Sequence, residues 1–141
     1  MPNQSNKSIE HNRVLTDRLT SAIPNIVDAF DPEEIILYGS YARGDNSLYS
    51  DIDLIIIAET VMRFQDRSLK ALNIINDKEG DIAINPLVYT STEFKNMLES
   101  KESFLVSAMI ESVLLWKKEA GCDISAQLES PQLHSDYKQY L

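Results

Sequence analysis

The sequence predicts an α/β or α+β domain with a small mixed sheet flanked by helices. Short apolar runs typical of buried strands recur at 35–38, 51–58 and 113–116. Strands that are apolar on both faces require helices that cover their sheet. Segments with apolar residues at helical spacing alternate with these runs along the chain. The alternation of the two patterns indicates a layered domain.

The length and composition bound the organisation of the chain. A chain of 141 residues usually folds around a single core. We expect a disordered N-terminus at 1–7, one domain over 8–120 and a polar tail over 121–141. The single cysteine cannot form an intramolecular disulfide, and neither a secretory signal nor a run of ~20 apolar residues is found. A cytoplasmic protein without a membrane span is therefore expected.

The formal charge is strongly negative. Twenty-two acidic residues stand against 13 basic ones, which gives a net charge of -9. Binding to nucleic acid through a basic surface is disfavoured, because neutralisation of phosphates supplies most of such affinity. An acidic chain suits metal ions or a basic protein partner.

The first helical segment begins near residue 8. Its apolar residues recur at helical spacing as far as Phe30. Pro24 interrupts the pattern, so we expect the helix to end near Ile23 and a short second helix to follow.

The central elements follow a turn at 31–34. The expected order is a strand at 35–38, a glycine turn at 39–40, a brief helix at 41–43, a loop at 44–50 and a strand at 51–58. The last of these carries the strongest strand signal in the chain.

The later elements are weaker as patterns. A helix is expected over 61–76 and a strand over 81–89, where Pro86 favours a sheet edge or a bulge. Thr90 and Glu93 have capping-box spacing and open a helix to about residue 98. A helix over 102–110 and a strand over 113–116 complete the domain.

Gly39 and Ser40 after the first strand have the chemistry of a phosphate site. A glycine permits a sharp turn and close approach of a phosphate, and the next amides are unpaired donors at a helix N-terminus. The serine adds a hydroxyl. A glycine and serine after a strand are common, so this pair alone is weak evidence.

Asp51 and Asp53 add a metal-binding pattern. Side chains two residues apart on a strand lie on one face, so both carboxylates project together. Their repulsion is relieved by a cation between them, and Mg²⁺ is commonly held by one or two carboxylates together with substrate phosphates.

The spacing of the two patterns resembles a known motif. A glycine and a serine are followed by ten residues and then by an Asp-x-Asp pair. The segments GSYARG at 39–44 and SDIDLIII at 50–57, and more weakly LVYTSTEF at 87–94 and IESVLLW at 110–116, are similar to the DNA polymerase beta superfamily of nucleotidyltransferases. The chain most closely resembles its minimal nucleotidyltransferase branch, which implies a polymerase-beta-like fold.

The resemblance implies roles for individual residues. Gly39 and Ser40 would hold the terminal phosphates of ATP, and Asp51 and Asp53 would be catalytic and bind two Mg²⁺ ions. Arg43 would contact phosphate as a bidentate donor, or it would pair with a surface acid.

One position departs from the family pattern. The superfamily's third carboxylate, which ligates a metal and helps to deprotonate the acceptor, falls on Asn85. An amide oxygen can coordinate a metal weakly, but the amide cannot act as the base. Asp81 lies four residues earlier, ~13 Å of strand away, and would need a bulge to replace it.

The resemblance also implies a partner. Minimal nucleotidyltransferases of this type resemble antitoxins that transfer AMP from ATP to a tyrosine of a helical HEPN-domain toxin. With no room for an acceptor domain, the acceptor is expected to dock from outside, across a hetero- or homo-oligomer interface. The alternatives are an inactive antitoxin that acts by binding alone, which Asn85 favours, and a small-molecule nucleotidyltransferase.

Overall fold

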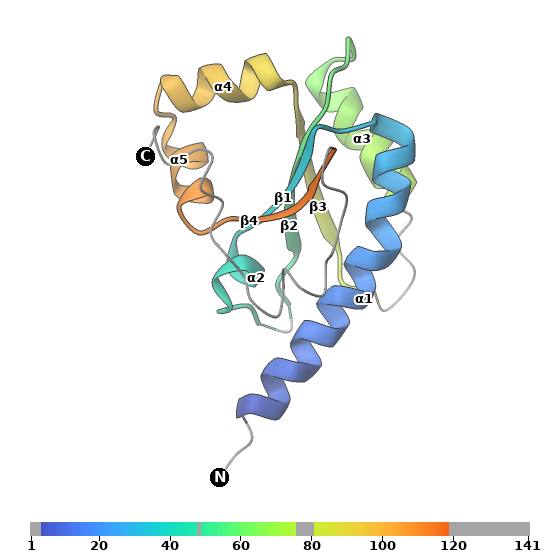
Figure 1. The fold of residues 1–141 in the computed structure, drawn as a ribbon, viewed down its shortest axis with the longest axis vertical. Coiled ribbons are helices and arrows are strands. Elements are labelled where there is room, and N and C mark those ends of the chain that lie inside the picture. The colour runs from blue at the N-terminus through green and yellow to red at the C-terminus, as the bar shows by residue number, and fades with distance from the viewer. Residues whose placement is uncertain (1–3, 48, 76–80, 119–141) are drawn as a thin grey trace.

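The computed structural model describes residues 4–47, 49–75 and 81–118 (Figure 1). The elements in chain order are α1 (Gln4–Phe30), β1 (Glu34–Tyr38), α2 (Ser40–Arg43), β2 (Ile52–Ile57), α3 (Phe64–Ile75), β3 (Ile84–Tyr89), α4 (Ser91–Glu99), α5 (Ser103–Ile110) and β4 (Val113–Lys117). The predicted tail over 121–141 and residues 1–3 lie outside these ranges.

The four strands form one mixed sheet in the order β3-β2-β1-β4. β1 runs antiparallel to both β2 and β4, whereas β2 and β3 are parallel. The small mixed sheet with flanking helices confirms the predicted fold class. Because β1 runs opposite to the other three strands, its C-terminal end lies at the same end of the sheet as the N-terminal ends of β2, β3 and β4.

Helices cover both faces of the sheet (Figure 1). α1 and α3 pack on one face around a core that includes Leu19, Ile26 and Leu54. α4 and α5 pack on the other face around Ile36, Phe94 and Leu105. All five residues of β1 are buried, as are five of the six in β2. Their near-continuous apolar sequence is thus explained by burial on both faces.

The prediction of a helix break near Ile23 is wrong. α1 continues through Pro24 to Phe30, and it begins at Gln4, within the segment expected to be disordered. Pro24 is exposed, whereas Ile23 and Ile26 on either side are almost wholly buried against the sheet. Burial of these side chains therefore outweighs the loss of one backbone hydrogen bond in the helix.

The third strand is shorter than the sequence indicates. β3 begins at Ile84 rather than at residue 81, and it forms an edge of the sheet. Because proline cannot donate a ladder hydrogen bond, Pro86 predicted a sheet edge or a bulge, and its place on an edge strand confirms this prediction. The predicted capping box is confirmed as well, since Thr90 and Glu93 exchange both hydrogen bonds at the start of α4.

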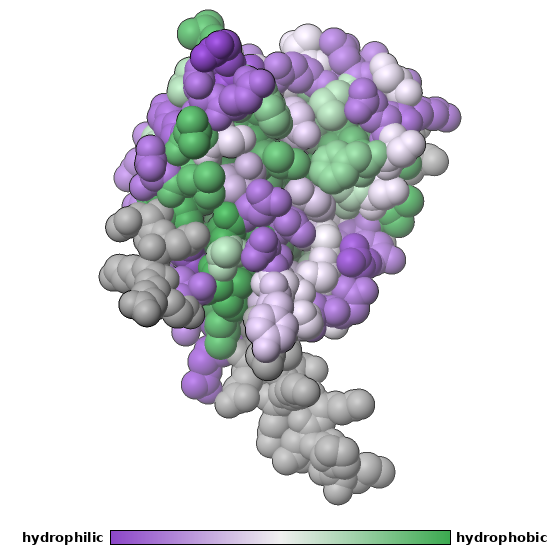
Figure 2. All heavy atoms as spheres, turned by 180° about the vertical axis from the view of Figure 1, so that it is seen from behind, coloured by the Kyte–Doolittle hydropathy of each residue, from purple (hydrophilic) through white to green (hydrophobic). Residues whose placement is uncertain are grey.

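The surface of the described residues mixes polar and apolar side chains. Seen from behind, hydrophobic groups lie among hydrophilic ones (Figure 2). Among the described helices, none is both long and apolar enough to cross a membrane.

Candidate active site

The predicted site residues lie at one end of the sheet, where the C-terminal end of β1 meets the N-terminal ends of β2 and β3. In the ladder, Asp53 near the start of β2 lies opposite Tyr38 at the end of β1 and opposite Asn85 on β3. The amide Nδ2 of Asn85 donates a long hydrogen bond of 3.4 Å to Oδ1 of Asp53. By strand alternation these side chains belong to the face that α4 and α5 cover.

Gly39 is required by its contact with Asp53. Its φ of +79° with ψ of -156° is a conformation that side chains rarely adopt. A Cβ at this position would also overlap Oδ2 of Asp53. The glycine therefore brings the backbone after β1 directly against a metal-ligand candidate.

Ser40 begins α2, a single turn that follows the glycine. The amide of Arg43 donates to the carbonyl of Gly39 at 3.1 Å, and the amide of Gly44 donates to that of Ser40 at 2.9 Å. The amides of the first turn have no acceptor within so short a helix and are oriented towards its N-terminal end. Tyr41 and Ala42 pack against the core on the α1 side, which fixes the direction of the turn.

The two carboxylates lie close enough to affect each other. Burial raises the pKa of Asp53, and the negative charge of Asp51 raises it further. The hydrogen bond from Asn85 and the positive charge of Arg43 lower that pKa, and so oppose the first two effects only in part. An anion that is half-buried beside a second anion favours the binding of a cation.

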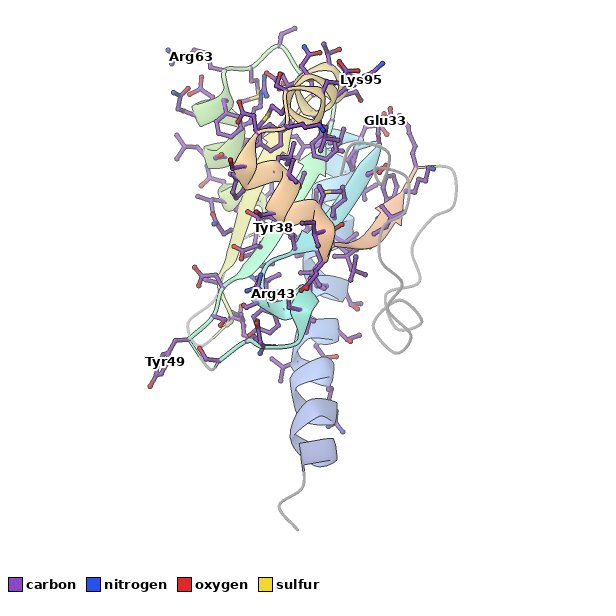
Figure 3. All side chains as sticks on the ribbon, turned by 90° about the vertical axis from the view of Figure 1, so that its left-hand side faces the viewer. Glu33, Tyr38, Arg43, Tyr49, Arg63 and Lys95 are labelled. Atoms are coloured by element: carbon purple, nitrogen blue, oxygen red, sulfur yellow. The ribbon has the colours of Figure 1, made fainter. Side chains whose placement is uncertain are left out.

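Arg43 lies at the rim of this group of charges. Its Nε forms an ion pair of 3.1 Å with Oδ2 of Asp45, and both side chains are exposed. The same guanidinium is near enough to lower the pKa of Asp53. Figure 3 shows Arg43 below Tyr38, whereas Tyr49 points away from the ribbon. Arg43 thus pairs with a surface acid and also faces the site.

Asp81 is not on β3. It lies in the bend before the strand, four residues ahead of Asn85, and is exposed. Among the described residues, no three His, Cys, Asp or Glu side chains come together as a metal site. The metal-ligand candidates that the structure brings near one another are the carboxylates of Asp51 and Asp53 and the amide of Asn85, whose nitrogen here donates to Asp53.

Sequence reasoning missed Tyr38, which lies opposite Asp53 in the ladder, and Phe104, which packs on Tyr38. Burial raises the pKa of Tyr38, and the charge of Asp53 raises it further. The ring of Phe104 on α5 meets the ring of Tyr38 edge-to-face, with centroids 5.9 Å apart. The position of Tyr38, immediately before Gly39, was the available signal for the first residue. Only tertiary packing brings Phe104 there.

The LVYTSTEF segment has a structural explanation in this chain. Glu93 of the capping box receives two hydrogen bonds from Arg67, at 2.6 and 3.2 Å. Arg67 is almost fully buried and also donates to the carbonyls of Met62 and Val88. These contacts tie α3 and β3 to α4 at the end of β3 remote from Asp53.

The donor set fits Mg²⁺. This ion takes oxygen ligands and is commonly bound by one or two carboxylates together with substrate phosphates. Asp53 lies on β2 and Asp51 immediately before that strand, close enough for the charge of Asp51 to raise the pKa of Asp53. Gly39, which precedes α2, lies against the carboxylate of Asp53. These residues would supply part of a magnesium shell that phosphate oxygens would complete.

Comparison with known proteins places these features in a family. A family model described as "Nucleotidyltransferase domain" matches residues 21–114. A protein of Methanocaldococcus jannaschii named "Putative protein adenylyltransferase" is 30% identical over 74 residues, which cover 51% of this chain and 74% of that protein. The crystal structure of a "putative nucleotidyltransferase" from Sulfolobus solfataricus shares the fold, with a TM-score of 0.62, 21% identity, and coverage of 88% of this chain and 99% of that one.

Proposed function

We propose that this chain, which belongs to the nucleotidyltransferase domain family, transfers AMP from ATP to a hydroxyl group of a partner protein. The observation that carries the proposal is the contact between Gly39 and Asp53, which brings the glycine turn against one of the two neighbouring carboxylates. The name of the M. jannaschii relative supports a protein as acceptor.

The reaction assigns a role to each of these residues. Gly39 and Ser40 hold the terminal phosphates, with Arg43 at the rim, while Asp51 and Asp53 hold Mg²⁺. The bound Mg²⁺ supplies neutralisation of the charge that develops on the phosphate oxygens. The acceptor oxygen forms a bond to the α-phosphorus, the bond from that phosphorus to the bridging oxygen breaks, and pyrophosphate leaves.

The proton of the acceptor hydroxyl needs a destination. Asn85 cannot take it, because an amide is not a base at physiological pH. The proton passes to water, which makes transfer slow, or to Asp81 if the acceptor docks beside the bend before β3. Asp81→Asn separates these routes: loss of transfer assigns the proton to Asp81, and retained transfer assigns it to water.

The partner that we propose is a HEPN-domain toxin, with a tyrosine as the acceptor and this chain as its antitoxin. A net charge of -9 favours a basic, RNA-binding partner. An adjoining short helical reading frame with an Arg-x4-6-His motif would support the pair, and its absence would argue for another acceptor.

The second candidate is an antitoxin that neutralises its partner by binding alone. The hydrogen bond from Asn85 to Asp53 favours it, because an amide occupies the position opposite Asp53 where the family pattern has a third carboxylate.

A transfer assay distinguishes the two candidates. The protein is incubated with ATP labelled at the α-phosphate, Mg²⁺ and its co-encoded partner. We expect label on the partner that disappears in Asp53→Asn and persists in Asp66→Asn. Asp66 lies in the first turn of α3, beyond the C-terminal end of β2, and pairs with Arg63. Its variant therefore removes the same charge from the opposite end of the sheet. Tight complex formation without label would favour the binding module.

A further inference from the structure

A half-exposed phenylalanine packs on Tyr38, the buried residue that lies opposite Asp53. Phe104 is the second residue of α5, and 48% of its surface is exposed. Its ring contacts that of Tyr38 edge-to-face, with an interplanar angle of 85°. Tyr38 itself is buried, whereas about half of Phe104 remains exposed beside it.

The contact with Tyr38 places Phe104 one side chain away from the carboxylates. Tyr38 lies opposite Asp53 in the ladder and directly precedes Gly39. Phe104 is therefore connected through Tyr38 to the strand pair that carries Asp53, on the same face of the sheet. A nucleotide held by its phosphates at the glycine turn would reach Phe104 by extending its base along this face.

We propose that Phe104 is the residue on which the base of the bound nucleotide stacks. This inference rests on the proposed function, which provides the nucleotide. Stacking of a base on an aromatic side chain contributes substantial affinity and tolerates different bases, since every base has a π-face. Phe104 therefore supports binding of ATP and GTP alike.

The other aromatic residues near the carboxylates are less suited to this role. Tyr41 packs against the core on the α1 side. Tyr49 is 93% exposed and points away from the ribbon. Among the described residues, Phe104 combines an exposed ring with a contact to the residue opposite Asp53.

Ile110 provides a matched control on the same helix. It is also exposed, at 51%, and it lies six residues from Phe104, which places it on a different side of the helix. If the exposed apolar residues of α5 served only to dock a partner, both side chains would matter for the partner and neither for the nucleotide.

The test measures binding of the α,β-methylene analogue of ATP, with Mg²⁺, by titration calorimetry. We expect Phe104→Leu to weaken binding by about 5- to 150-fold, the range of one aromatic–base stack. Leucine keeps an apolar contact with Tyr38, so the fold is retained. Phe104→Trp should restore affinity, and Ile110→Ala should leave it unchanged.

Inorganic tripolyphosphate, which lacks a base, separates stacking from general damage to the site. Its binding should be the same in the wild-type protein and in Phe104→Leu. Equal weakening for tripolyphosphate and the ATP analogue would overturn the stacking role, as would unchanged binding of the analogue by Phe104→Leu. Absence of nucleotide binding by the wild-type protein would instead overturn the proposed function.

Discussion

At the scale of single residues, Gly39 carries the tightest geometric constraint. Both Gly39 and Gly44 have positive φ, at +79° and +81°, but only a Cβ on Gly39 would meet a neighbour, the carboxylate of Asp53. The pair therefore separates backbone strain from damage to the site.

Alanine at these two positions should have different effects. Gly44→Ala should cost about 1–2 kcal/mol of unfolding free energy, from strain in the left-handed region, and leave nucleotide binding intact. Gly39→Ala should cost more and abolish Mg²⁺-dependent nucleotide binding, because Asp53 must move. Denaturant unfolding and nucleotide titration measure the two effects. Similar nucleotide affinity in both variants would contradict the close contact.

Asn85 lies opposite Asp53 at the position where the family pattern has a third carboxylate. Asn85→Asp replaces a donor to Asp53 with a third carboxylate on the same face. We expect tighter Mn²⁺ binding, as a paramagnetic probe for Mg²⁺, and faster transfer. A positioned base contributes about 10²–10⁴-fold, so an increase of at least tenfold is expected. Unchanged metal affinity and rate would show that this position does not complete the site.

At the scale of elements, Arg67 on α3 joins α4 through its ion pair with Glu93 and β3 through its hydrogen bond to the carbonyl of Val88. Thr90→Ala should cost about 1 kcal/mol of unfolding free energy through loss of the α4 cap.

Glu93→Gln keeps the capping function of the side chain but removes its charge. Because the Glu93 side chain is 43% exposed, we expect a loss of about 1–2 kcal/mol, below the 3–5 kcal/mol of a fully buried pair.

The pH dependence of that loss follows from the pKa of Glu93. The hydrogen bond from Arg67 is the main cause that lowers this pKa below its ordinary value of 4.5. A lowered carboxyl pKa gives stability that is present above the ordinary value and is lost as the pH falls through the folded-state pKa. The difference between wild type and Glu93→Gln should therefore shrink below about pH 4.5. A difference independent of pH would contradict a charged pair.

Pro24 is a second feature at this scale. In α1 it removes one backbone hydrogen bond, and it is exposed. Pro24→Ala should raise the unfolding free energy by about 1–3 kcal/mol, because proline in a helix interior is unfavourable by about 3 kcal/mol relative to alanine. Thermal unfolding monitored by circular dichroism measures the change. Destabilisation would show that the proline-induced geometry of α1 is needed for packing.

The sequence predicted the elements better than their limits. The apolar run at 51–58 indicated β2, and Thr90 with Glu93 indicated the start of α4, because both signals are local. The helix break predicted at Pro24 is wrong, because burial of Ile23 and Ile26 against the sheet is a tertiary effect that the local sequence does not show. The spacing of Gly39, Ser40, Asp51 and Asp53 indicated the site, whereas Phe104 follows from the packing of α5, which no local pattern contains.

At the scale of the whole molecule, the two faces of the sheet differ in what they carry. The face under α1 and α3 is a continuous apolar core. The face under α4 and α5 ends in Asp53 and Asn85, where β1, β2 and β3 meet. A mixed sheet is essential to this arrangement, because antiparallel β1 brings Gly39 to the ends at which β2 and β3 begin.

We propose above all that this end of the sheet binds a nucleotide through Mg²⁺. The most direct measurement is calorimetric titration of the α,β-methylene ATP analogue into the protein, with Mg²⁺ or with EDTA. We predict one site that requires Mg²⁺, is lost in Asp53→Asn and is retained in Asp66→Asn. Binding that persists with EDTA, or that is unaffected by Asp53→Asn, would contradict the account.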